Sequence, residues 1–177
     1  MNPAECPALE IMNRLSSARI LLIDDTPEKK DVVAESLRGQ PWDVVEALNG
    51  PLGLDLAKEK QFDLILLGIG ADGHCASLFP NQASLNERSR LVVGVPEAGL
   101  APFVPRISFT LPMLAAGRHV VFLATGEAKA DAIAKAFGPG TDPDPATPAS
   151  LLVPEAKLIT VLCDQSAAAH VPTGDRR

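Results

Sequence analysis

The chain has 177 residues, of which 46% are hydrophobic, and it carries a formal net charge of −6. This length and composition suit one globular domain with a substantial core, and the acidic balance argues against nucleic acid and anionic membranes as partners. No apolar run approaches the roughly 18 residues of a membrane-spanning helix, and the first residues lack the basic and apolar pattern of an export signal. We therefore expect a cytoplasmic protein.

The first half of the sequence alternates between predicted strands and predicted helices. An aliphatic run at residues 19–23 ends in Asp24 and Asp25, as expected of a buried parallel strand that delivers two carboxylates at its C-terminal end. Further strands are predicted at residues 42–46 and 62–67, and helices between Thr26 and Gly39 and over residues 52–60. This order predicts a parallel sheet with right-handed crossovers.

The second half begins with a glycine-rich loop at residues 68–74 and is predicted to continue the sheet. Residues 75–80 are interpreted as a helical turn, and proline and glycine make residues 138–148 a surface loop. Strands are predicted at residues 91–95, 106–110, 119–125 and 158–163, and helices at 112–116, 127–137 and 165–170. The complete pattern predicts an α/β fold, a three-layer α/β/α sandwich with a mainly parallel sheet.

The most specific pattern in the chain is the run FDLILLGIGADGHCASLFP at residues 62–80. Four segments follow it: PRISFTLPML (105–114), HVVFLATGEAKADAI (119–133), TPASLLVP (147–154) and LCDQSAA (162–168). Together they resemble the 6-phosphogluconolactonase family, and the resemblance covers residues 62–168. It implies a lactonase-like second half and a pentose phosphate pathway reaction, the opening of 6-phospho-D-glucono-1,5-lactone to 6-phosphogluconate.

The first half departs from that family pattern. Residues 1–61 contain neither its glycine-glycine-serine-threonine phosphate loop nor its aspartate-glutamate-arginine motif. Residues 18–67 instead resemble the opening half of a response-regulator receiver domain, which implies a flavodoxin-like first half, although Gly68 stands at the phosphoacceptor position. We therefore interpret the chain as a single α/β domain that joins two halves, either by natural fusion or as an engineered chimera. Its parts are an N-terminal extension (1–17), a receiver-like half (18–67) and a lactonase-like half (68–170).

His74 is the predicted catalytic base. Opening a lactone with water needs a base for the water proton and a donor or cation for the oxyanion. Histidine is largely neutral at physiological pH, and a glycine-flanked loop lets the backbone approach a ligand closely. Asp72 is predicted to orient His74 or to hold a substrate hydroxyl. On spacing alone, a simple turn with a surface histidine is an equal alternative, and the family resemblance favours the catalytic role.

Arg106 and Lys129 are the predicted phosphate ligands, with Gly70 and Gly73 as further substrate-binding positions. Both basic residues match basic positions in the family segments and lie beside strand ends. Arginine can clamp a phosphate with two hydrogen bonds. The alternative for Lys129 is a solvated helix residue within the charged run 127–135.

Asp24 and Asp25 have two alternative interpretations. Carboxylate oxygens are ligands that Mg²⁺ prefers, so the pair could hold this ion beside the glycine-rich loop. The other interpretation is surface charge, or charge favoured by the positive end of the following helix. The predicted reaction itself requires no cofactor.

The leading functional prediction is a 6-phosphogluconolactonase-type hydrolase that acts on a phosphorylated sugar lactone, with weak or no activity because the upstream phosphate loop is missing. Two alternatives stay open: a non-catalytic, receiver-like binding or signalling module, and a chimeric scaffold without activity. A protein partner or a homo-oligomer is compatible with all of them.

Overall fold

The computed structural model describes residues 19–23, 35, 42–47, 63–101 and 103–172. The chain divides into two compact units, Met1–Leu64 and Ile65–Arg177. The prediction of a single domain divided after residue 67 stays a prediction.

The first unit contains two parallel strands, β1 (Arg19–Ile23) and β2 (Asp43–Ala47). Ile20 in β1 also pairs in parallel with Leu64, the first residue of β3 (Leu64–Gly68). Ile20 is buried, as its place in an aliphatic run predicted. The predicted helices of this half lie outside the described residues, apart from Glu35, which is helical.

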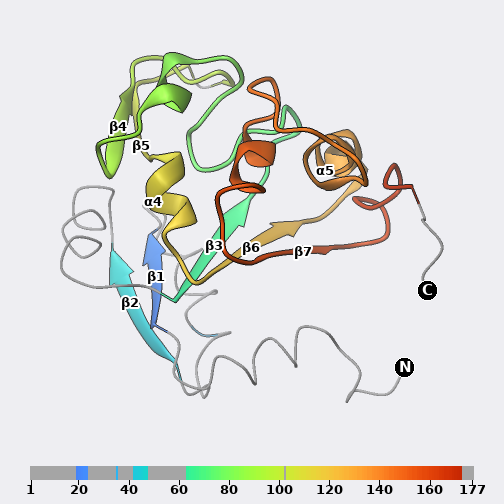
Figure 1. Cartoon of the computed structure of the whole chain (residues 1–177), viewed down its shortest axis with the longest axis horizontal. Helices are drawn as coiled ribbons and strands as arrows, with labels where there is room; N and C mark the ends of the chain where they lie inside the picture. Colours follow the sequence, from blue (N-terminus) through green and yellow to red (C-terminus); the bar gives the residue numbers. More distant parts are fainter. Residues whose placement is uncertain (1–18, 24–34, 36–41, 48–62, 102, 173–177) are drawn as a thin grey trace. The chain divides into compact units, whose positions relative to one another are not determined.

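The second unit is built on β3, β6 (His119–Ala124) and β7 (Ile159–Cys163), which are neighbours in that order. β6 and β7 pair in parallel, and the arrows of β3 and β6 point the same way in Figure 1. The loops that follow these strands therefore emerge at the same edge of the sheet. The result is an α/β fold whose strands are mainly parallel.

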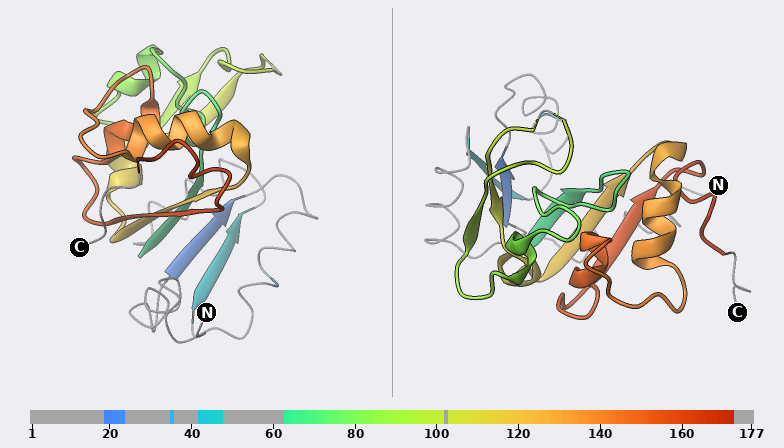
Figure 2. Two further views of the ribbon diagram at one scale, coloured as in Figure 1. Left: turned by 90° about the vertical axis from the view of Figure 1, so that its right-hand side faces the viewer. Right: turned by 90° about the horizontal axis from the view of Figure 1, so that it is seen from above.

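Two helices cover one face of these strands, α4 (Leu111–Ala115) and α5 (Ala130–Phe137), as Figures 1 and 2 show. Leu114 from α4, Phe122 from β6 and Ile133 from α5 belong to one buried core. The three-layer arrangement stays a prediction.

Capping hydrogen bonds and residue type explain where α4 begins and where α5 ends. The hydroxyl oxygen of Thr110 accepts the N–H of Met113 (3.4 Å), and Pro112 lies in the first turn of α4, where its missing N–H costs nothing. α5 buries one face of small and aliphatic residues, and Gly138 ends it by donating its N–H to the carbonyl of Ala134 (2.9 Å).

The prediction that the sheet continues through residues 91–110 is wrong. β4 (Val92–Val95) and β5 (Arg106–Phe109) form a separate antiparallel pair. Their connection spans residues 96–105, and its described residues contain no helix. A parallel pairing needs a longer crossover, usually a helix, so the short connection dictates the antiparallel arrangement.

Two predicted helical segments are turns. Residues 165–170 form a series of turns, and residues 75–80 contain an antiparallel bridge between Cys75 and Leu78. Ala76 has a φ of 51°, in the left-handed region, which is incompatible with a right-handed helical turn. The side chains of Cys75 and Leu78 are both fully buried, so core packing fixes this conformation.

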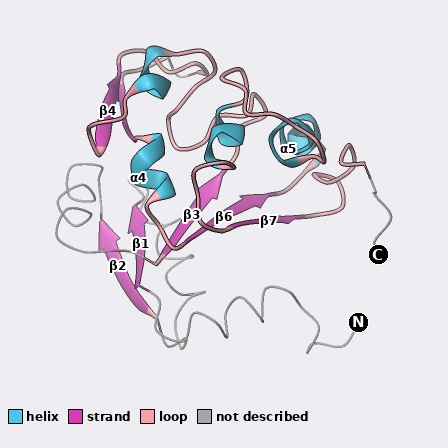
Figure 3. Ribbon diagram, in the orientation of Figure 1, coloured by secondary structure: helices cyan, strands magenta, loops and turns pink. Residues whose placement is uncertain are grey.

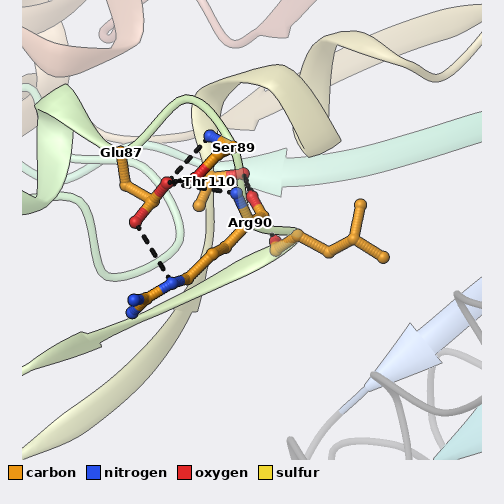
Figure 4. A network of polar contacts seen from close by, with 5 residues as sticks. Glu87, Ser89, Arg90 and Thr110 are labelled. Carbon is orange, nitrogen blue, oxygen red and sulfur yellow. Dashed lines mark hydrogen bonds and ion pairs between the residues drawn. The ribbon is translucent and has the colours of Figure 1, made fainter.

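A polar network fixes the loop between η2 (Ala83–Asn86) and β4 (Figure 4). Glu87 Oε1 accepts hydrogen bonds from the N–H and the hydroxyl of Ser89, both 2.8 Å, and from the N–H of Arg90 (3.1 Å). These bonds, led by the one from the Ser89 backbone, lower the pKa of Glu87 to about 2. The Thr110 hydroxyl donates to the carbonyl of Arg90 (2.8 Å), which ties the loop to the start of α4.

His119 should make the stability of the fold depend on pH. It is 4% exposed, and its Nε2 lies 2.9 Å from the hydroxyl oxygen of Thr160. Burial lowers the pKa of His119, so below about pH 6.5 the unfolded chain binds a proton that the folded chain resists. Stability contributed by the neutral imidazole is therefore present above that pH and is lost as the pH falls.

We expect the urea midpoint of the wild type to decrease between about pH 7.5 and pH 5.5, and this decrease to be smaller in His119→Gln. Glutamine keeps a polar group near Thr160 but does not titrate in this range. Equal decreases in the two proteins would contradict the assignment to His119.

Candidate functional site

The loop that follows β3 brings Asp72 and His74 into contact. Asp72 Oδ1 lies 2.6 Å from His74 Nδ1 and also accepts the backbone N–H of His74 (3.2 Å). The side chains are 26% and 23% exposed, so the pair is sheltered but open to solvent. The two residues predicted as helper and base thus form a carboxylate–imidazole pair, an arrangement that can orient a histidine for proton transfer.

The backbone under this pair is closed by its own hydrogen bonds. The N–H of Gly70 donates to the carbonyl of His74 (2.8 Å), and the N–H of Gly73 donates to the carbonyl of Gly70 (3.0 Å). A side chain at Gly70 would overlap the imidazole ring of His74 and the carboxylate of Asp72. The pair therefore packs directly on the Gly70 backbone, and Gly70 has a packing role whether or not it binds substrate.

Gly73, in the same loop, contacts residues that are distant in the sequence. Gly73 has a φ of 82°, a conformation that favours glycine, and its carbonyl accepts the N–H of Ala149 (3.0 Å). A Cβ on Gly73 would lie 2.8 Å from Cγ2 of Thr147. Thr147 and Ala149 are buried at the start of η4 (Pro148–Leu152), so this short helix supports the loop.

The neighbours of His74 favour a role for the imidazole over one for the adjacent thiol. The ring of Phe79 lies 4.7 Å from that of His74, centroid to centroid, and tilted by 39°. Cys75 is fully buried, and this burial raises its pKa to about 12. The thiol therefore stays protonated at physiological pH and is unsuited to nucleophilic attack.

Arg106 opens β5, on the side of that strand that meets the loop after His74. Ser108 Oγ accepts the backbone N–H of Ser77 (3.1 Å), and side chains two residues apart on a strand point to the same face. Arg106 Nε is buried and has no hydrogen-bond partner among the described residues. A buried donor without a protein partner is rare in folded proteins. The sequence did not single out Ser108.

Lys129 lies at the same edge of the sheet, on a different loop. It ends η3 (Glu127–Lys129), which follows β6, and its N–H donates to the carbonyl of Gly126 (3.1 Å). Because β3 and β6 are neighbours that point the same way, their loops emerge together. The segment that directly follows β3 is drawn as loop in Figure 3.

The two residues of the metal prediction lie outside the described part of the chain. Asp24 and Asp25 are not among the described residues, so their proposed Mg²⁺ site stays a prediction. Within the described part of the chain, no group of three or more histidine, cysteine, aspartate or glutamate side chains is placed to hold a metal ion. The same part contains no helix that is long and apolar enough to cross a bilayer.

Comparison with known proteins shows that the chain matches one protein family. Residues 12–161 match the family model described as glucosamine-6-phosphate isomerases/6-phosphogluconolactonase. A 6-phosphogluconolactonase from Synechocystis is 42% identical over 110 residues, and the human 6-phosphogluconolactonase is 40% identical over 107 residues. These matches cover 62% and 60% of this chain but 43% and 40% of the relatives, so the chain spans less than half of their length.

Solved structures agree on the fold. The 6-phosphogluconolactonase of Leishmania guyanensis superposes with a TM-score of 0.53 at 28% identity, over 64% of this chain and 43% of its own. That of Thermotoga maritima gives 0.58 at 19% identity and covers 88% of this chain and 89% of its own, which shows the fold alone.

The comparisons give no support to a receiver-like first half or to a chimera. The family match begins at residue 12 and so includes most of the segment that resembled a receiver domain. A flavodoxin-like first half therefore stays a prediction without support, and one family accounts for both halves.

Proposed function

Because the chain belongs to the glucosamine-6-phosphate isomerase/6-phosphogluconolactonase family, we propose that it is a 6-phosphogluconolactonase, which opens 6-phospho-D-glucono-1,5-lactone with water. The relatives at about 40% identity carry the lactonase name, which favours this activity over the isomerase reaction. The activity is a proposal for this chain because it spans less than half of those relatives.

The Asp72–His74 pair is the observation that carries the proposal. With Nδ1–H donated to Asp72, the lone pair of His74 lies on Nε2, on the other side of the ring. This tautomer is inferred from the contact. The imidazole is then oriented to accept a proton from a water molecule, and partial exposure of the pair leaves room for that water.

The proposed reaction has two steps and needs no cofactor. Water attacks the lactone carbonyl carbon while His74 Nε2 takes its proton, which gives a tetrahedral oxyanion. The bond between that carbon and the ring oxygen then breaks, and the imidazolium returns the proton to the departing oxygen. The product carboxylic acid then loses its proton to solvent, which gives 6-phosphogluconate and the acid that is released, and the histidine is neutral again.

Arg106 and Lys129 are the proposed ligands of the substrate phosphate. Arg106 brings a buried Nε that lacks a partner among the described residues, on the strand that contacts the loop after His74. Lys129 adds a positive charge at the edge where that loop emerges. Charge-assisted hydrogen bonds from such groups are about twice as strong as neutral ones, so they would hold the lactone by its phosphate.

The activity is tested with freshly generated 6-phosphogluconolactone, because this lactone also opens spontaneously. We expect acid release above the spontaneous rate, in proportion to protein concentration. A rate equal to background at every protein concentration would overturn the proposed activity. 6-Phosphogluconate should also raise the melting temperature, since a ligand that binds only the folded state stabilises it.

A further inference from the structure

Asp164 makes hydrogen bonds that reach outside its own segment. It is the first residue after β7, and its two carboxylate oxygens accept the N–H of Gly126, at 3.1 and 3.0 Å. Its own N–H donates to the carbonyl of Ala124 (3.3 Å). The residue after β7 is therefore hydrogen-bonded both to the last residue of β6 and to the turn that follows β6.

The group that Asp164 holds belongs to a turn that requires glycine. Gly126 has a φ of 89° and a ψ of 150°, a backbone conformation that residues with a side chain rarely adopt. A Cβ at Gly126 would meet nothing within 4 Å, so the conformation, and not lack of space, requires glycine. The bonds to Asp164 satisfy the Gly126 N–H and restrain this turn.

Lys129 is hydrogen-bonded to the turn that Asp164 restrains. The carbonyl of Gly126 accepts the N–H of Lys129 (3.1 Å), so the turn closes on the lysine directly. Asp164 occupies the N–H of Gly126, and the Lys129 side chain adds the positive charge that this turn can offer to an anion.

We propose that Asp164 is a positioning residue for substrate binding. It fixes the Gly126 turn from the neighbouring strand and thereby holds Lys129 in place for the phosphate of the lactone. The inference rests on the proposed function.

Asp164 also supports the C-terminal turns, and the test must separate the two roles. Its Oδ1 accepts the N–H of Ala167 (2.8 Å), and Ala167 is fully buried. Asp131 offers a matched control, because its carboxylate, in α5, pairs with His170 Nδ1 (2.7 Å) in the C-terminal turns, whereas the described side-chain hydrogen bonds of Gly126 go to Asp164. Asp131→Asn should therefore loosen the C-terminal turns alone.

The experiment compares steady-state kinetics and amide exchange in the wild type, Asp164→Ala, Asp164→Asn and Asp131→Asn. For Asp164→Ala we expect KM for the lactone to rise about tenfold with kcat changed less than about twofold, and faster amide exchange over residues 125–129. Asp164→Asn keeps one oxygen as an acceptor and should recover part of the loss. Asp131→Asn should match the wild type in both readouts.

Each other result has a distinct meaning. If the wild type is active and Asp164→Ala has an unchanged KM, the positioning role is overturned, even if amide exchange over residues 125–129 becomes faster. An equal rise of KM in Asp131→Asn would assign the effect to general loosening of the C-terminal turns and would also overturn it. Wild-type protein without lactonase activity would instead overturn the proposed function, and the inference with it.

Discussion

Replacing His74 with alanine is expected to reduce the rate of lactone hydrolysis by about 10²–10⁴-fold, which is the usual contribution of a positioned general base. The side chain is partly exposed, and it contacts Asp72 through one hydrogen bond, the ring of Phe79 and the backbone of Gly70. Its removal should therefore leave the fold intact. The measurement is the hydrolysis rate corrected for spontaneous opening, together with the melting temperature of each protein.

His170→Ala provides the matched control. His170 also places its Nδ1 2.7 Å from an aspartate oxygen, that of Asp131, but it lies in the C-terminal turns and not in the loop after β3. We expect this variant to keep the wild-type rate. His74→Ala with undiminished activity, or an equal loss in His170→Ala, would refute His74 as the base. Asp72→Asn should also lower the rate strongly, because an amide N–H facing Nδ1 favours the tautomer with its proton on Nε2, which cannot accept the proton of water.

Much of the fold was predictable because short aliphatic runs specify buried strands. The predicted boundaries of β1, β6 and β7 agree with the structure to within one residue. The antiparallel pairing of β4 with β5 was missed, since an apolar run shows that a strand forms but not which strand it pairs with. The receiver-like interpretation of residues 18–67 had a related cause, because alternating strands and helices occur in many parallel α/β folds.

The sequence predicted the reactive residues of the candidate site but not the long-range contacts that hold the surrounding loops in place. Asp72 and His74 are two residues apart, so a sequence motif can bring them together. Ser108 contacts Ser77 across 31 residues, and Asp164 contacts Gly126 across 38. Such contacts depend on tertiary packing and leave no local periodicity or spacing in the sequence.

The second large effect is expected for Gly70→Ala. Its methyl group would overlap the imidazole of His74 and the carboxylate of Asp72, and these cannot both keep their positions. The backbone cannot easily yield either, because Gly70 is bonded through its N–H to His74 and through its carbonyl to Gly73. We expect a rate loss of about 10²-fold or more and only a small loss of stability, because the two side chains that must move are partly exposed. Hydrolysis kinetics and urea unfolding measure the two effects.

Gly68→Ala separates this overlap from the general cost of replacing glycine near the strand end. Gly68 lies at the end of β3, two residues before Gly70, and a Cβ there would meet nothing within 4 Å. Neither Gly68 nor Gly70 has a positive φ, so alanine suits the backbone at both positions and the variants differ in what the new methyl group meets. Gly68→Ala should therefore keep near wild-type activity and stability. If the two variants lose activity equally, the loss comes from the changed backbone and not from displacement of the Asp72–His74 pair.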